Sequence, residues 1–160
     1  MLRALAVLLI PIALLLTFYR VVLNGDAPTP VDPAPAIEAA RAANAFPVSA
    51  PGDLGGDWHV ASATFRREAA GATLRIGYVD PDGNGMQLIE SSVPPATLVP
   101  AELTSAAKPV DTFRAEERVW RRYDARSGEQ ALVYSEPGRT LIVVGSAESR
   151  HLQTFAATLP

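Results

Sequence analysis

Arginines and aromatic residues alternate between positions 118 and 123, where they could bind an anion. In an extended strand Arg118 and Arg122 share the face of Trp120, whereas Arg121 lies on the other face with Tyr123, because successive side chains point to opposite sides. A guanidinium group binds a carboxylate or phosphate through paired hydrogen bonds. The pattern therefore predicts Arg118, Trp120 and Arg122 as ligand-binding residues for an anionic small molecule.

The same stretch has a plainer interpretation, in which its arginines form salt bridges on a solvent-exposed strand. Four acidic residues stand close enough in sequence to neutralise the arginines: Glu116, Glu117, Asp124 and Glu129. Exposed ion pairs of this kind are common and contribute little to stability. The balance of charges favours the salt-bridged surface, and the anion site is the functional alternative.

A turn-rich segment that begins at Asp80 matches the first half of a calcium loop. Asp80, Asp82 and Asn84 place oxygen ligands at alternate positions, and Gly85 permits a sharp turn. The closing bidentate carboxylate should fall at position 91, which is a serine. We therefore expect a plain hairpin turn there and no bound metal.

Histidines and nucleophiles do not form a recognisable catalytic set. His59 and His151 are the only histidines, and neither has a second ligand at zinc-site spacing. His59 lies near Ser62, but no Gly-x-Ser-x-Gly motif and no orienting carboxylate accompany the pair. The sequence predicts no catalytic residue, no metal ligand and no cofactor. An enzyme stays the alternative, because carboxylates distant in sequence could meet on a sheet.

An apolar segment precedes all these groups and determines where we expect them to act. No charged residue occurs from Ala4 to Tyr19, and a helix over residues 2–23 would be about 33 Å long at ~1.5 Å per residue, enough to cross a bilayer. We predict a transmembrane anchor over residues 1–23. A cleaved secretory leader is the main alternative, although the apolar regions of leaders are shorter.

The charge distribution predicts how the rest of the chain is placed. Arg3 precedes the uncharged run, and basic residues stay on the cytoplasmic side. This predicts a single-pass cell-membrane protein with a cytoplasmic N-terminus and an extracytoplasmic C-terminal domain. Four prolines in residues 24–36 predict a semi-rigid spacer. All 17 acidic residues but only 12 of the 14 basic ones follow residue 23. This acidic balance disfavours a nucleic-acid partner.

Residues 37–160 are predicted to form one domain of the α+β class. The alanine-rich stretch 37–45 favours a helix, and a second helix capped by Ser146 would carry Leu152, Phe155 and Leu159 on one apolar stripe. The prolines in residues 93–108 predict an irregular connection. Strands are expected at 58–67, 73–79, 86–91, 112–123, 130–135 and 140–145. The predicted fold is an N-terminal transmembrane helix followed by an antiparallel sheet of five or six strands, covered by an N-terminal and a C-terminal helix.

Several short segments resemble one known family in the same order along nearly the whole chain. The segments are the loop Pro-Gly-Asp-Leu at 51–54, Trp-His-Val-Ala-Ser-Ala at 58–63, Leu-Arg-Ile-Gly-Tyr at 74–78, Gly-Met-Gln-Leu-Ile-Glu-Ser at 85–91, Trp120, and Ile-Val-Val-Gly-Ser-Ala at 142–147. With the N-terminal anchor, they resemble the actinobacterial membrane proteins grouped as domain of unknown function 4245. Two departures are Gly55-Gly56, where a Leu-Pro pair is usual, and Asp80, where threonine is commoner. The resemblance implies an anchored extracytoplasmic domain and assigns no catalytic residue.

The predicted anchor, the predicted spacer and the lack of a recognisable catalytic set together favour a non-enzymatic module of the cell envelope. Such a module would bind an envelope protein or an anionic small molecule, in addition to the lipid bilayer through residues 2–23. The alternative is a cell-envelope enzyme that uses carboxylates or arginines assembled on the sheet. A polar pocket with convergent carboxylates would favour the enzyme, and an arginine-aromatic patch would favour the binding module.

Overall fold

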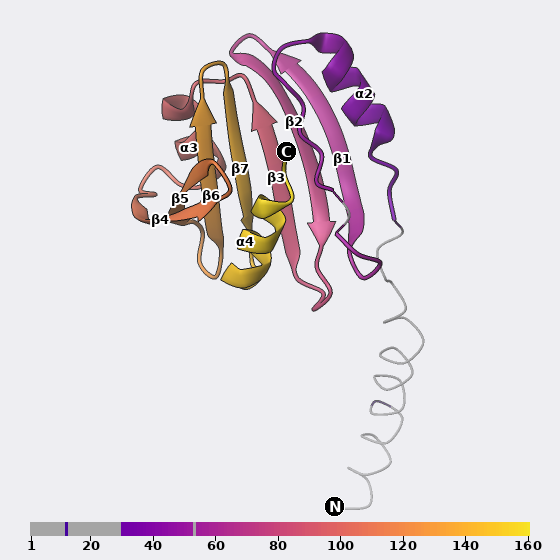
Figure 1. The fold of residues 1–160 in the computed structure, drawn as a ribbon, viewed down its shortest axis with the longest axis vertical. Helices are drawn as coiled ribbons and strands as arrows, with labels where there is room; N and C mark the ends of the chain where they lie inside the picture. Colours follow the sequence, from indigo (N-terminus) through magenta and orange to yellow (C-terminus); the bar gives the residue numbers. More distant parts are fainter. Residues whose placement is uncertain (1–11, 13–29, 53) are drawn as a thin grey trace, which may run out of the picture.

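One antiparallel sheet dominates the structure, a computed structural model that describes residues 12, 30–52 and 54–160. Seven strands within the described residues follow the order β1-β2-β3-β7-β6-β5-β4 (Figure 1). Their bounds are β1 His59–Glu68, β2 Gly71–Val79, β3 Gly85–Ser91, β4 Pro109–Ala115, β5 Arg118–Asp124, β6 Gln130–Glu136 and β7 Arg139–Gly145. The α+β class is confirmed.

The predicted count of five or six strands was wrong because the stretch 112–123 is a hairpin and not one strand. Strands β4 and β5 pair antiparallel, with Ala115 opposite Arg118. The turn between them holds Glu116 at φ +51°, a left-handed conformation that two-residue hairpin turns require. Glycine, asparagine and aspartate are the usual residues at such positions, so a Glu-Glu turn gives little signal in the sequence.

Helices cover both faces of the sheet. On the first face lie α2 (Ala34–Ala43) and α4 (Ser149–Ala157) (Figure 1). They share a hydrophobic core with side chains such as Leu74, Leu88 and Trp120. On the second face, α3 (Pro95–Glu102) packs with residues such as Ile89, Val133 and Ile142. The alternation of β-strand side chains explains why neighbouring residues such as Leu88 and Ile89 belong to different cores.

The terminal helix carries the apolar stripe that its spacing predicted. Leu152, Phe155 and Leu159 are 1%, 0% and 3% exposed. The ring of Phe155 lies 4.8 Å from that of Tyr78 and 5.9 Å from that of Trp58, which fixes α4 against the sheet and the loop before β1. The helix begins at Ser149, with Glu148 and not Ser146 at its N-cap.

The other two helices differ from prediction at their prolines. Helix α2 begins earlier than residue 37, because Pro35 is accepted in the first helical turn. The connection expected to be irregular contains α3, which starts with Pro95 and includes Pro100. Eight residues make only two turns, so a proline inside costs few backbone hydrogen bonds, and burial of Leu98 and Val99 holds the helix on the sheet.

The predicted membrane anchor lies almost wholly outside the described residues. Apart from Ile12, residues 1–29 are not described. In the part of the chain that is described, no helix has the length and apolar character needed to cross a bilayer. The anchor over 1–23 therefore stays a prediction, and so does the spacer, of which only residues 30–36 are described.

Candidate functional site

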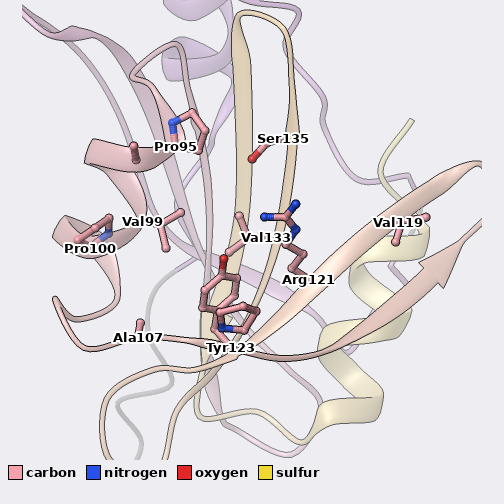
Figure 2. A pocket seen from close by; sticks show the side chains of 11 residues that line it. Pro95, Val99, Pro100, Ala107, Val119, Arg121, Tyr123, Val133 and Ser135 are labelled. Carbon is pink, nitrogen blue, oxygen red and sulfur yellow. The ribbon is translucent and has the colours of Figure 1, made fainter.

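A cavity of about 540 Å³ lies on the second face of the sheet, between α3 and strands β5 and β6 (Figure 2). Its volume is within the range of small-molecule binding sites. Eight of its eleven described lining residues are apolar, among them Val99, Pro100 and Val133. Among the residues that the structure describes, Arg121 is the only charged one that lines it.

The limited reach of α3 explains the opening. Arg75 on β2 forms an ion pair with Glu102, which fixes the end of α3 over the second strand of the sheet. Cross-strand pairing then continues from Arg75 through Ile89 and Ile142 to Val133, and Arg121 is the next residue in this row. Helix α3 is about 12 Å long and does not extend over β5, so the outer end of the row is left uncovered.

Three hydrogen-bond donors converge on this uncovered end. Arg121 and Tyr123 are two residues apart on β5 and share a face, and Ser135 lies diagonally opposite Arg121 on β6. Figure 2 shows the Arg121 guanidinium, the Tyr123 hydroxyl and the Ser135 hydroxyl at the same cavity. Within the described ranges, no side chain or backbone group forms a hydrogen bond or an ion pair with these three side-chain groups. They are free to bind a ligand.

The electrostatics of the cavity favour an anion. Its single guanidinium carries a positive charge, and none of its described lining residues is an Asp, Glu or His. Arg121 is exposed, so water screens part of that charge, and the preference for an anion rests on the charge-assisted hydrogen bonds that a guanidinium group can donate.

The sequence-predicted ligand residues lie on the opposite face and have partners within the protein. Arg118 donates a hydrogen bond to the Leu159 carbonyl at 2.7 Å, and a second one to the carbonyl of Pro160. Its guanidinium also lies 5.4 Å from the centre of the Tyr134 ring. Arg118 therefore positions the end of the chain after α4.

Trp120 and Arg122 are also used by the fold. Trp120 is 0% exposed and packs against Tyr134, so no ligand reaches it in this conformation. Arg122 binds both carboxylate oxygens of Asp111 on β4, with its Nε 2.8 Å from Oδ1. This pair agrees with the salt-bridged interpretation of the arginine face.

Arg121 is the residue that sequence reasoning left out of the site. Strand periodicity had already placed Arg121 with Tyr123 on the face away from Trp120. No sequence signal indicated that this second face would stay open, since the helix that partly covers it was expected to be irregular. The contribution of Ser135 from β6 was equally hidden, because the register between β5 and β6 is a tertiary feature.

His151 has acidic neighbours that the sequence did not reveal. Its Nδ1 lies 2.7 Å from Asp80 Oδ2 and 3.7 Å from Asp82 Oδ2, because α4 packs against the β2–β3 turn. Asp80 also accepts hydrogen bonds from the backbone of Asp82 at 3.0 Å and from the backbone and side chain of Asn84 at 2.7 and 3.3 Å. Burial raises the pKa of Asp80, but the hydrogen bonds from His151 and Asn84 outweigh it and hold the pKa below its usual value.

Asp80, Asp82 and His151 could offer ligand atoms to a metal ion, since these atoms all lie within 4.8 Å of one another. The Asp80 carboxylate is already fully hydrogen-bonded, however, and Arg150 supplies a cation 3.6 Å from Asp82. A metal would have to displace these contacts. We interpret the cluster as a link that fastens α4 to the hairpin turn.

A second buried carboxylate holds the loop after α2 on the sheet. Glu90 is 0% exposed, accepts the Ser49 backbone N–H at 2.9 Å and lies 3.8 Å from Arg139. Burial is the main cause that raises the pKa of Glu90 to about 7. Arg139 also donates to the Pro47 carbonyl at 2.8 Å and to Glu136 at 2.6 Å. The group is structural, since it faces the covered side of the sheet.

Comparison with known proteins bears on family and not on activity. A family model described as "Protein of unknown function (DUF4245)" matches residues 1–159, which confirms the resemblance seen in the short segments. Neither the curated proteins nor the solved structures contain a match to this chain. Any function must therefore be argued from the site itself.

Proposed function

We propose that this chain, which belongs to the DUF4245 family of proteins of unknown function, is a non-enzymatic module that binds an anionic small molecule beside α3. The observation that carries the proposal is the meeting of Arg121, Tyr123 and Ser135 in one cavity with no protein partner for their side-chain donors among the described residues. Polar groups that converge in a pocket whose other lining residues are apolar are typical of ligand sites. A free guanidinium among them favours an anion.

Binding is favoured over catalysis by the chemistry of the lining. No carboxylate and no imidazole is among the described residues of the cavity wall, so the side chains that most often act as general acid or base are missing there. Asp80 and Glu90, the two buried carboxylates among the described residues, are held by contacts within the fold. The rival hypothesis of a carboxylate-based envelope enzyme therefore has no support from these groups.

Calorimetric titration of the full chain in lipid nanodiscs tests the proposal. The probes are octanoate, octyl phosphate and inorganic phosphate, and heats from empty nanodiscs are subtracted. We expect saturable binding of at least one probe and a loss of roughly 10- to 100-fold in affinity for Arg121→Ala, the cost of charge-assisted hydrogen bonds. Absence of binding, or equal binding by Arg121→Ala, would refute the anion site.

Arg66→Ala is the matched control for that titration. Arg66 is an exposed arginine on β1, on the same face of the sheet but five strand spacings away, about 24 Å. The change removes the same charge from the chain without touching the cavity. Affinity should stay within about twofold of wild type, because a charge at this distance is mostly screened by salt.

We further propose that the module is tethered to the cell membrane with its folded domain outside the cytoplasm. The uncharged run from Ala4 to Tyr19 supports this, as does the position of Arg3 before it. Alkaline extraction of membranes and protease treatment of intact cells test the two halves of the proposal. Release of the chain by alkali would exclude the anchor, and protection of residues 37–160 from external protease would exclude the orientation.

A further inference from the structure

The number and charge of the free donors restrict which anion fits the cavity. Arg121 presents two parallel N–H groups, and the hydroxyls of Tyr123 and Ser135 add one donor each. A carboxylate has two oxygens with about four lone-pair sites, which these four donors can satisfy. A phosphate monoester has a third free oxygen and a charge of up to −2. With these four donors and one guanidinium, the third oxygen would lack a hydrogen-bond donor and one negative charge would lack a countercharge.

The remainder of the wall restricts what is attached to the anionic group. Beyond the donors, the cavity is bounded by Val99 and Pro100 of α3, Val119 of β5 and Val133 of β6. These side chains offer no hydrogen-bonding group, so a polar body such as a sugar gains no side-chain hydrogen bond from them in exchange for the water it displaces. An aliphatic chain has no hydrogen bonds with water to lose there, and removal of its apolar surface from water favours binding.

We propose that the ligand is an aliphatic monocarboxylate, with its carboxylate on Arg121 and its hydrocarbon chain between α3 and β6. This inference rests on the proposed anion site and specifies its ligand. The polar end of the cavity lies on β5 and β6, and its apolar side lies along α3 (Figure 2). A single-chain carboxylate has the same division into one charged end and one apolar body.

A series of carboxylates of increasing length tests the apolar part of the inference. Acetate, butanoate, hexanoate and octanoate are titrated into the full chain in nanodiscs, with empty nanodiscs as the blank. Affinity should rise roughly two- to fourfold per methylene, the upper value corresponding to full burial of each group. Equal binding of acetate and octanoate would overturn the inference, because the walls would then not contact the chain.

Octanol, octylammonium and octyl phosphate test the carboxylate part. Octanoate should bind at least tenfold more tightly than each, and Arg121→Ala should remove its advantage over octanol. If octyl phosphate binds more tightly than octanoate and depends on Arg121, the carboxylate inference fails while the anion site stands. If Arg121→Ala changes the affinity for none of the probes, the anion site and the carboxylate inference both fail.

Two conservative variants test the hydroxyl donors without disturbing the fold. Tyr123→Phe keeps the buried ring, and Ser135→Ala changes an exposed side chain. Each should weaken octanoate roughly 10- to 100-fold, the effect of one hydrogen bond to a charged group, and leave octanol unchanged. Unchanged octanoate affinity in both variants would overturn the four-donor arrangement. Melting temperatures measured without ligand separate a binding defect from a folding defect.

Discussion

The buried Glu90 makes a specific prediction about how stability depends on pH. The fold raises its pKa from 4.5 to about 7, because a fully buried carboxylate loses water and is only partly compensated by Ser49 and Arg139. Between these two values the folded state holds a proton that the unfolded state has released. This contribution to stability is therefore complete below about pH 4.5 and is lost as pH rises through 7.

The magnitude follows from the size of the pKa change. A difference of about 2.5 units corresponds to about 3 kcal/mol, and roughly 2–3 kcal/mol of it falls between pH 5 and pH 8. Glu90→Gln cannot ionise but keeps an oxygen that can accept the Ser49 N–H. The variant should therefore gain stability relative to wild type by about this amount when pH is raised from 5 to 8.

Urea unfolding of the full chain in mild detergent measures this difference. Trp58 and Trp120, the only tryptophans, report the transition by fluorescence. Comparing variant with wild type at each pH cancels the titration of all other groups. Glu68→Gln is the matched control, since Glu68 is exposed at the end of β1, and it should show no such trend. If the difference in unfolding free energy between Glu90→Gln and wild type were the same at pH 5 and pH 8, the reasoning would be refuted.

Three further changes test other parts of the fold. Phe155→Ala should destabilise by about 3–5 kcal/mol, because it empties the contact between α4 and the sheet, and chemical denaturation measures the loss. Asp80→Asn should lower the stability of the fold at neutral pH, because the lowered pKa of Asp80 in the folded state contributes stability as long as the carboxylate is ionised. Acid removes that contribution from wild type, so the difference in melting temperature between variant and wild type should be smaller at pH 3 than at pH 7. Glu116→Gly should stabilise by about 0.5–1 kcal/mol by relieving a left-handed conformation, whereas Glu117→Gly should not, as thermal unfolding of both variants will show.

Local patterns predicted the elements whose signal lies within a few residues. The strand 73–79 and its hairpin to 85 were identified from alternation and turn residues, and Val79 does pair with Gly85. The stripe of Leu152, Phe155 and Leu159 predicted a helix that must be covered, and all three are buried. Where local chemistry was atypical, prediction failed: a Glu-Glu turn hid one hairpin, and prolines hid α3.

The sequence likewise predicted only part of the candidate site, and the rest depended on the tertiary structure. Alternation alone placed Arg121 and Tyr123 on one strand face and Arg118, Trp120 and Arg122 on the other. Which face would be free for a ligand depended on contacts between residues far apart in the chain. Arg118 is bound to the Leu159 carbonyl 41 residues away, and Glu102 anchors α3 to β2 across 27 residues.

By itself, the sequence determined the α+β class, the faces of individual strands and the family to which the chain belongs, because each depends on residue type and short-range periodicity. Only the tertiary structure decided which arginine is free, where α3 ends over the sheet and which strand brings Ser135 to Arg121. The physical reason is that a side chain is available to a ligand only when no other part of the fold satisfies it, and those competing partners are set by packing and strand register over long distances in the chain.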